Sequence, residues 1–164
     1  EVWQRGPSPE FIPVFQPIAH ALLQAREEVA DYMNQFPDGL LWLRPAGVAS
    51  VGFHLQHLSG VLDRVFTYAR AEKLSTLQFE QLAEEDKDAP IGYTVENLVN
   101  RFNKQVNDAL AQLKVTNEST LGDYRGVGRA GLPSTVIGLL FHAAEHTLRH
   151  VGQLLVTASV LKQL

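Results

Sequence analysis

Apolar residues recur along most of this chain at intervals of three and four, which is the spacing of one face of an α-helix. Four long stretches carry this pattern, at residues 17–36, 50–71, 94–114 and 134–161, and no stretch shows a convincing strand pattern. Residues 72–93 are polar and acidic, which indicates a short surface helix and a loop. The pattern therefore predicts an all-α protein whose four principal helices form a bundle.

Residues that favour helix ends mark several of these boundaries. Ser50 and Thr94 are predicted N-caps, because a hydroxyl oxygen there can accept a hydrogen bond from the first helical turn. The sequence Pro-Asp-Gly that begins at Pro37 is expected to stop the first helix. The connection between the second and third helices is long enough to cross the bundle, so a simple up-down-up-down order is not required.

The last predicted helix differs from the others in how its apolar residues are distributed. Between residues 134 and 161 they wrap around most of the helix instead of forming one stripe. A helix of this kind is central in its fold or lies at an interface between subunits. The apolar surface exceeds what a bundle core requires, so the sequence predicts a homodimer.

The composition is that of one globular domain, predicted to span residues 1–164 with residues 1–16 as an N-terminal arm. Cysteine is absent, which excludes disulfides, thiolate metal sites and a cysteine nucleophile. The net charge is −4 and the Lys and Arg residues are scattered, so the sequence predicts no basic surface for binding nucleic acid. No apolar run approaches the ~18 residues of a membrane span, and the first residues lack the features of a secretory signal, so a cytoplasmic protein is expected.

The spacing of the histidines is the strongest chemical signal in the sequence. His142, His146 and His150 recur at every fourth position of the last predicted helix, and a second group, His54 and His57, lies on the second predicted helix. Positions four apart lie on one helix face about a turn apart, so two such imidazoles can turn their nitrogens toward one ion. Histidine is the commonest protein ligand for borderline transition metals. The two groups therefore predict a metal site between helices.

Two interpretations compete for His146 and His150. An arbitrary pair at this spacing is more often a structural pair satisfied by backbone or carboxylate groups. Here the helix is strongly apolar, where an unpaired imidazole is costly, and a bundle brings the second histidine group close. His57 shares the apolar stripe of its helix and is predicted to be the third ligand. His54 and His142 are predicted to lie beside the site and to support the ligands or contact a substrate.

Two other patterns carry weaker chemical signals. Residues 126–131 match GxGxxG literally, but the dinucleotide fingerprint needs a preceding strand and a βαβ unit, and neither is predicted. We interpret this segment as a flexible or tightly turning loop. Three arginines could bind an anionic ligand, namely Arg5, Arg64 and Arg149. Such arginines are more often solvated or ion-paired.

The segments SVGFHLQHLSGVLDRVFTYA and LPSTVIGLLFHAAEHTLRHVGQLL together resemble the DinB-like superfamily of metal-binding four-helix bundles. The most specific parts are the histidine in the second predicted helix and the late signature of His146, His150, Gly152 and Gln153. The resemblance implies an up-down-down-up bundle and a three-histidine site for a divalent metal, often nickel or zinc. The matching ligand positions are His57, His146 and His150. It also implies a homodimer, since many members look like homodimers.

The activities of that family differ between members. Some relatives resemble transferases or isomerases that use a low-molecular-weight thiol, and others resemble metal-dependent hydrolases. The leading hypothesis is a metal-dependent enzyme with a small-molecule substrate, because three histidines leave a coordination position open. His54, His142, Arg149 and Gln153 are then candidates for substrate contact or for supporting the ligands. The alternative is a metal- or ligand-binding stress-response module without turnover. A fourth protein ligand would favour the alternative, and an open site facing a pocket would favour catalysis.

Overall fold

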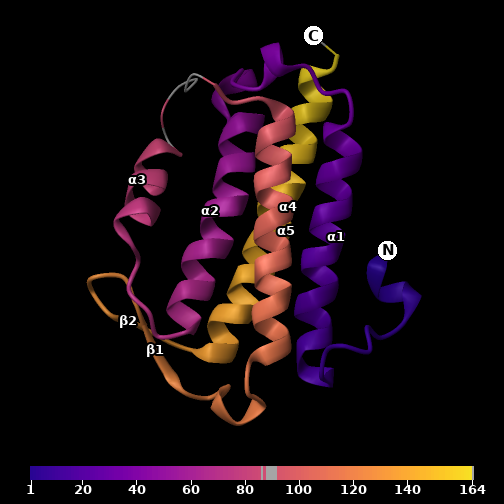
Figure 1. Cartoon of the computed structure of the whole chain (residues 1–164). Coiled ribbons are helices and arrows are strands. Elements are labelled where there is room, and N and C mark those ends of the chain that lie inside the picture. The colour runs from indigo at the N-terminus through magenta and orange to yellow at the C-terminus, as the bar shows by residue number, and fades with distance from the viewer. Residues whose placement is uncertain (86, 88–91, 164) are drawn as a thin grey trace.

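The computed structural model describes residues 1–85, 87 and 92–163. Within them the chain is mostly helical, with five α-helices and one small sheet (Figure 1). The elements are α1 Gln16–Met33, α2 Val51–Ala69, α3 Thr76–Glu84, α4 Val95–Val115, β1 Tyr124–Val127, β2 Leu132–Thr135 and α5 Val136–Leu161.

The four long helices are present close to the positions that the apolar periodicity predicts. Ser50 and Thr94 act as N-caps, since their side chains accept hydrogen bonds from the backbone N–H groups of Phe53 and Asn97. The largest difference is at the end of α1, which was predicted to reach residue 36. Gln35 has a φ of +59°, a left-handed conformation that turns the chain away before the expected stop at Pro37.

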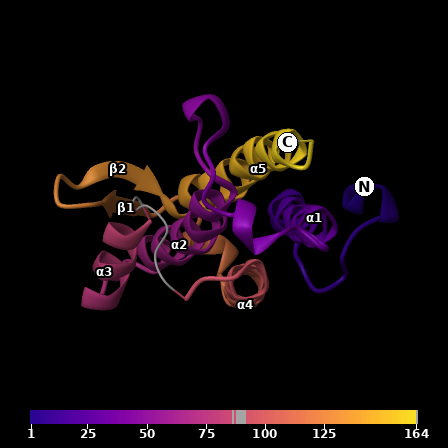
Figure 2. The ribbon, with the colours of Figure 1, turned by 90° about the horizontal axis from the view of Figure 1, so that it is seen from above.

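The four long helices lie side by side around one apolar core (Figure 2). α1 and α2 each pack against both α4 and α5. Their facing stripes bury large side chains completely, and each such side chain contributes about 1.5–3 kcal/mol relative to an exposed one. Examples from the four helices are Leu22, Leu62, Phe66, Phe102, Leu140 and Leu154. None of the helices within the described residues has both the length and the apolarity that crossing a membrane demands.

The prediction that the chain contains no strand is wrong, because β1 and β2 pair as an antiparallel hairpin. The GxGxxG segment spans the end of β1 and the turn to β2, where Gly128 and Gly131 have φ values of +68° and +61° that favour glycine. The strands are only four residues long and largely exposed, and Gly126 and Pro133 interrupt them. Such short and exposed strands carry no clear alternation of apolar and polar residues.

The short helix expected within residues 72–93 is α3. Ser75 and Gln78 form a capping box at its start, and Gln78 also donates a hydrogen bond of 2.8 Å from Nε2 to Oγ1 of Thr67 in α2. This buried bond ties α3 to α2. The loop predicted to follow falls partly on residues 86 and 88–91, which lie outside the described residues.

Candidate metal centre

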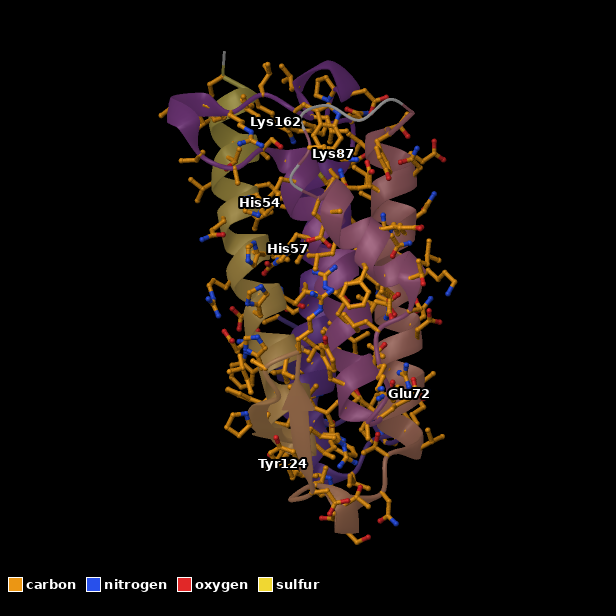
Figure 3. The ribbon with its side chains drawn as sticks, turned by 90° about the vertical axis from the view of Figure 1, so that its left-hand side faces the viewer. His54, His57, Glu72, Lys87, Tyr124 and Lys162 are labelled. Atoms are coloured by element: carbon orange, nitrogen blue, oxygen red, sulfur yellow. The ribbon has the colours of Figure 1, made fainter. Side chains whose placement is uncertain are left out.

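The two histidine groups of the sequence come together where α2 packs against α5. Figure 3 labels His54 and His57 of the α2 group. Ring nitrogens of His57, His146 and His150 all lie within 4.8 Å of one another. Nε2 of His57 is 3.0 Å from Nε2 of His146, and the ring centroids of His57 and His150 are 4.4 Å apart. His57 belongs to α2 and the other two to α5, so the group exists only when the two helices are packed.

A buried carboxylate fixes the orientation of His57. Oε2 of Glu85, a residue only 4 % exposed, lies 2.8 Å from Nδ1 of His57 and accepts its hydrogen bond. Nδ1 therefore carries a proton, and in the neutral imidazole Nε2 carries the lone pair and faces His146. Phe53 stacks on the imidazole, with ring planes 9° apart. Both the tautomer and the ring position of His57 are thus determined by the fold.

Glu85 is in turn held by Arg64 of α2. The Nη1 and Nη2 atoms of Arg64 donate to the two carboxylate oxygens of Glu85 at 2.5 and 3.2 Å. Burial raises the pKa of Glu85, but the hydrogen bonds and charges of His57 and Arg64 outweigh burial, so its pKa lies below the ordinary value. Glu85 is therefore ionised at neutral pH, as an acceptor for His57 and a counter-ion for Arg64.

Gly60 of α2 provides the space for this pair. A Cβ atom added at this position would collide with Oε1 of Glu85 and with Nη1 of Arg64. A glycine inside an apolar helix is a sequence signal of close packing, but it does not identify the neighbour. Glu85 was missed because it belongs to an acidic stretch that the sequence analysis placed on the surface.

His54 is connected to the group through His150. Its Nδ1 lies 3.1 Å from Nδ1 of His150, so one of these nitrogens donates and the other accepts. Burial, and secondly the charge of His57, lower the pKa of His54 to about 4. Burial followed by neighbouring charges, that of His57 first, likewise lowers the pKa values of His146 and His150 to about 4. All three are therefore neutral at pH 7, which is the form of imidazole that binds a metal.

The geometry around His146 fits a cation between the rings. The Nε2 atoms of His57 and His146 lie 3.0 Å apart, so without an ion one of them must carry a proton that the other accepts. The other nitrogen of His146, Nδ1, is buried and has no hydrogen-bond partner among the described residues, so none of these residues fixes which nitrogen of His146 carries the proton. An ion would instead be bound by lone pairs from neutral imidazoles, the donors that suit nickel and zinc.

The remaining candidates lie around this group on α5. His142 is 5.1 Å from His146 between ring centroids, and its Nδ1 donates to Glu145 at 2.8 Å. Glu145 also accepts two hydrogen bonds from Arg149. His142, Glu145 and His146 form a second cluster that could hold an ion. Its carboxylate is already paired with Arg149, and all three residues come from one helix, so the group centred on His57 is the stronger candidate.

Two hollows flank the histidines. One, of about 520 Å³, is lined by residues that include His54, Arg149 and Gln153. The other, of about 620 Å³, is lined by residues of α2, α3, the hairpin and α5 that include Arg64 and His142. The four residues predicted to support the ligands or contact a substrate are thus divided between the two hollows.

Comparison with known proteins places the chain in a family. The model of the DinB superfamily matches residues 21–154. No curated protein sequence matches the chain. Similar solved structures include a conserved protein from Enterococcus faecalis, with 19 % identity, a TM-score of 0.70 and coverage of 93 % of this chain and 99 % of the other. A candidate DinB family member from Exiguobacterium sibiricum has 18 % identity, a TM-score of 0.71 and coverage of 93 % and 94 %.

A DinB-like protein from Bacillus subtilis gives a similar result, with 16 % identity, a TM-score of 0.63 and coverage of 89 % of this chain and 92 % of the other. Identities this low show a common fold and nothing more specific. The family match rests instead on the sequence itself and extends over most of the chain, including every histidine of the two groups. The protein belongs to the DinB superfamily.

Proposed function

We propose that this protein binds a divalent metal ion, nickel or zinc, through His57, His146 and His150, and that it is a metal-dependent enzyme of the transferase or hydrolase type. The supporting observation is the convergence of three ring nitrogens within 4.8 Å across two helices. In the part of the chain that the structure describes, no fourth His, Cys, Asp or Glu joins this group. A three-histidine set with a free position is the arrangement of catalytic zinc sites, whereas structural sites have four protein ligands.

The ion would supply Lewis acidity toward a water molecule or a substrate thiol. The residues around it have separate tasks. Glu85 keeps the proton of His57 on Nδ1, so that Nε2 is available as a ligand. If His150 binds the ion through Nε2, its Nδ1–H donates a hydrogen bond to Nδ1 of His54. His54 can accept this bond because it is neutral. His142, Arg149 and Gln153 carry polar groups at the edges of the two hollows, where they can orient a substrate.

A low-molecular-weight thiol as co-substrate is proposed on the family resemblance alone. The alternative function is a metal- or ligand-binding module without turnover. An assay panel of thiol adducts and simple esters separates the two, provided that the metal content is measured on the same samples. Turnover that rises and falls with bound metal supports the enzyme. Full metal occupancy without turnover on either substrate class supports the binding module.

Elemental analysis of purified variants tests the ligand set. We expect about one ion per chain in the wild type and loss of most of it in His57→Ala, His146→Ala and His150→Ala. His20→Ala is the matched control, because His20 lies elsewhere, with Nε2 3.5 Å from Oγ of Ser8. Full metal occupancy in His57→Ala would contradict a site between the two helices.

We also propose that the four long helices form an up-down-down-up bundle and that two copies associate through α5. The packing of α1 and α2 against both α4 and α5 supports the bundle. Exposed apolar side chains on one side of α5 support the homodimer, and contiguous patches of this kind often mark interfaces. They are Phe141, Leu148, Val156 and Val160, with exposed fractions of 61, 37, 67 and 44 %. Sedimentation that shows a strict monomer at micromolar concentrations would contradict the dimer.

A further inference from the structure

We infer that the hollow between α2, α3, the hairpin and α5 binds the substrate of the metal centre, and that this substrate is a small molecule with an apolar body and an anionic end. The inference deepens the proposed function and rests on it. The hollow measures about 620 Å³. Pockets that enclose small organic molecules typically measure about 300–1,000 Å³.

The lining of this hollow is mainly apolar and comes from separate segments of the chain. Val61 and Val65 of α2 are nearly buried, with 7 and 8 % exposed. Phe79 and Leu82 of α3 and Leu132 of β2 are 46, 42 and 62 % exposed. Large apolar side chains cost free energy when they face water, and several of them gathered around one concavity indicate a ligand that covers them.

The charges around the hollow favour an anion. Its charged lining residues are Arg64 and Arg129, His142 and Tyr68 also line it, and no Asp or Glu is among the described residues that line it. Arg64 is neutralised by Glu85, and His142 is hydrogen-bonded to Glu145. Arg129 lies in the hairpin turn, is exposed, and has no ion-pair or hydrogen-bond partner within the described part of the chain. Its guanidinium is therefore available for a carboxylate or phosphate.

The hollow shares a wall with the metal centre. His142 lines it, and the His142 ring is 5.1 Å from the ring of His146. Arg64 also lines it, and Arg64 holds the carboxylate of Glu85 that accepts the hydrogen bond of His57. A ligand with its anion at Arg129 in the hairpin would extend its apolar body toward His142 on α5. The reacting group of the substrate is therefore the end remote from the anion.

The second hollow, beside His54, is a weaker candidate. Arg149 lines it, but this guanidinium is already bonded to both carboxylate oxygens of Glu145. Val156 also lines it and belongs to the exposed face of α5 that we assign to the homodimer. A second copy of the chain would cover this hollow, whereas the first lies over α3 and the hairpin.

Binding of two simple probes to the metal-free protein tests the pocket and its charge preference. Decanoate and decanol have the same apolar chain, and only decanoate is anionic. We expect Arg129→Gln to weaken decanoate binding about tenfold and to leave decanol binding unchanged, because one charge-assisted contact is lost. Arg101→Gln on α4 makes the same charge change away from this hollow and should bind both probes as the wild type does.

A change in the apolar wall should affect both probes. Leu82→Gln is tolerated at a position that is 42 % exposed, and we expect it to weaken decanoate and decanol alike. Calorimetric titration measures all of these constants. Equal decanoate affinity in Arg129→Gln and Arg101→Gln would overturn the anion assignment. Failure of the wild type to bind decanoate at millimolar concentration, or unchanged affinities in Leu82→Gln, would overturn the pocket itself.

The relation to the metal is tested by NMR of decanoate bound to cobalt(II)-loaded protein, with zinc-loaded protein as the diamagnetic reference. We expect cobalt-induced shifts that are larger for the methyl end than for the carbon next to the carboxylate. Shifts that are absent, or larger at the carboxylate end, would contradict the orientation toward the metal. If neither cobalt nor zinc binds at the histidines, the proposed function fails, while the titrations of metal-free protein still decide whether the hollow binds the anion.

Discussion

The interface of α1 with α4 and the junction of α2 with α5 belong to the same helical framework but have opposite chemistry. At the first, the side chains that α1 and α4 bury are all apolar; they include Leu22, Val29, Leu98, Phe102 and Val106. The second contains three histidines of the candidate metal centre, and behind them the buried Glu85 and Arg64.

The difference shows that stability and binding are largely separate in this fold. Buried apolar surface stabilises the helices in proportion to its area. Burying charges and imidazoles costs desolvation free energy that their mutual attraction only partly offsets, so the polar group at the junction of α2 and α5 adds little net stability beyond the apolar packing around it. Substitutions at the first interface should therefore change the free energy of unfolding, and substitutions at the second should change metal affinity.

The largest expected effect is on stability at the apolar interface. Phe102 is fully buried, and Phe102→Ala should lower the free energy of unfolding by about 3–5 kcal/mol, from lost burial and the cavity left behind. Urea denaturation measures the change, and Val115→Ala, on the same helix but 82 % exposed, should shift it by less than about 0.5 kcal/mol. Metal bound per folded molecule should stay the same. Loss of metal from the folded Phe102→Ala protein would mean that the two regions are not separable.

The next effect concerns the carboxylate behind His57. Glu85→Ala should weaken metal binding about 10–100-fold, because the imidazole loses the acceptor that fixes its tautomer. Glu85→Gln should weaken it less, since the amide oxygen can still accept from Nδ1. Competition with a chromophoric chelator measures the affinities. Glu80→Ala, an exposed change on α3, is the control. Equal metal affinities in Glu80→Ala and Glu85→Ala would show that Glu85 does not support metal binding.

Two glycine-to-alanine changes should have smaller and different effects on the free energy of unfolding. Gly152→Ala on α5 meets open space within its own chain and should raise the free energy of unfolding of the monomer by about 0.5–1 kcal/mol, through reduced backbone entropy of the unfolded chain. Gly60→Ala should not give this gain, because the new Cβ displaces Glu85 and Arg64. It should also weaken metal binding relative to Gly152→Ala. A Gly60→Ala protein that is more stable than the wild type and has unchanged metal affinity would show that Glu85 and Arg64 do not need the space beside Gly60.

A further effect, for which we predict the direction, is the pH dependence of the metal-free protein. The pKa values of His54, His146 and His150 are about 4 in the folded state and return toward about 6.5 on unfolding. Between these values the unfolded chain binds more protons, so the free energy of unfolding should fall as the pH is lowered through this range. His54→Gln removes one titrating group and should flatten the dependence. Urea denaturation that shows constant or rising stability on acidification would contradict the buried neutral histidines.

The sequence predicts the parts of this molecule that depend on local periodicity. The helices follow from apolar spacing, and the stripes that carry His57, His146 and His150 indicate that these residues can meet. Helical phase also distinguishes His57 from His54, because only His57 shares the apolar stripe of its helix. In the structure His57 joins the group of three, and His54 contacts His150 from outside it.

The parts that were missed depend on tertiary contacts. Glu85 is one of several acidic residues in a polar stretch, and nothing local distinguishes the one that enters the interior. Its burial requires α3 to be fixed on α2 by Gln78 and Thr67, and Gly60 to leave space. The hairpin was missed because its short strands pair with each other at the surface instead of burying an alternating face. Arg129 was missed as a candidate ligand-binding residue because the hollow that it lines forms only when the hairpin packs beside α2, α3 and α5.

The central claim is that imidazoles from two helices bind one ion at the junction of α2 and α5. X-ray absorption spectroscopy of the zinc-loaded protein tests it most directly. We expect nitrogen donors at about 2.0–2.1 Å, with outer scattering from three imidazole rings. The His20→Ala protein should give the same spectrum, and His57→Ala should show either no bound zinc or only two rings. Three rings that persist in His57→Ala, or a coordination shell made mainly of carboxylate oxygens, would contradict the account.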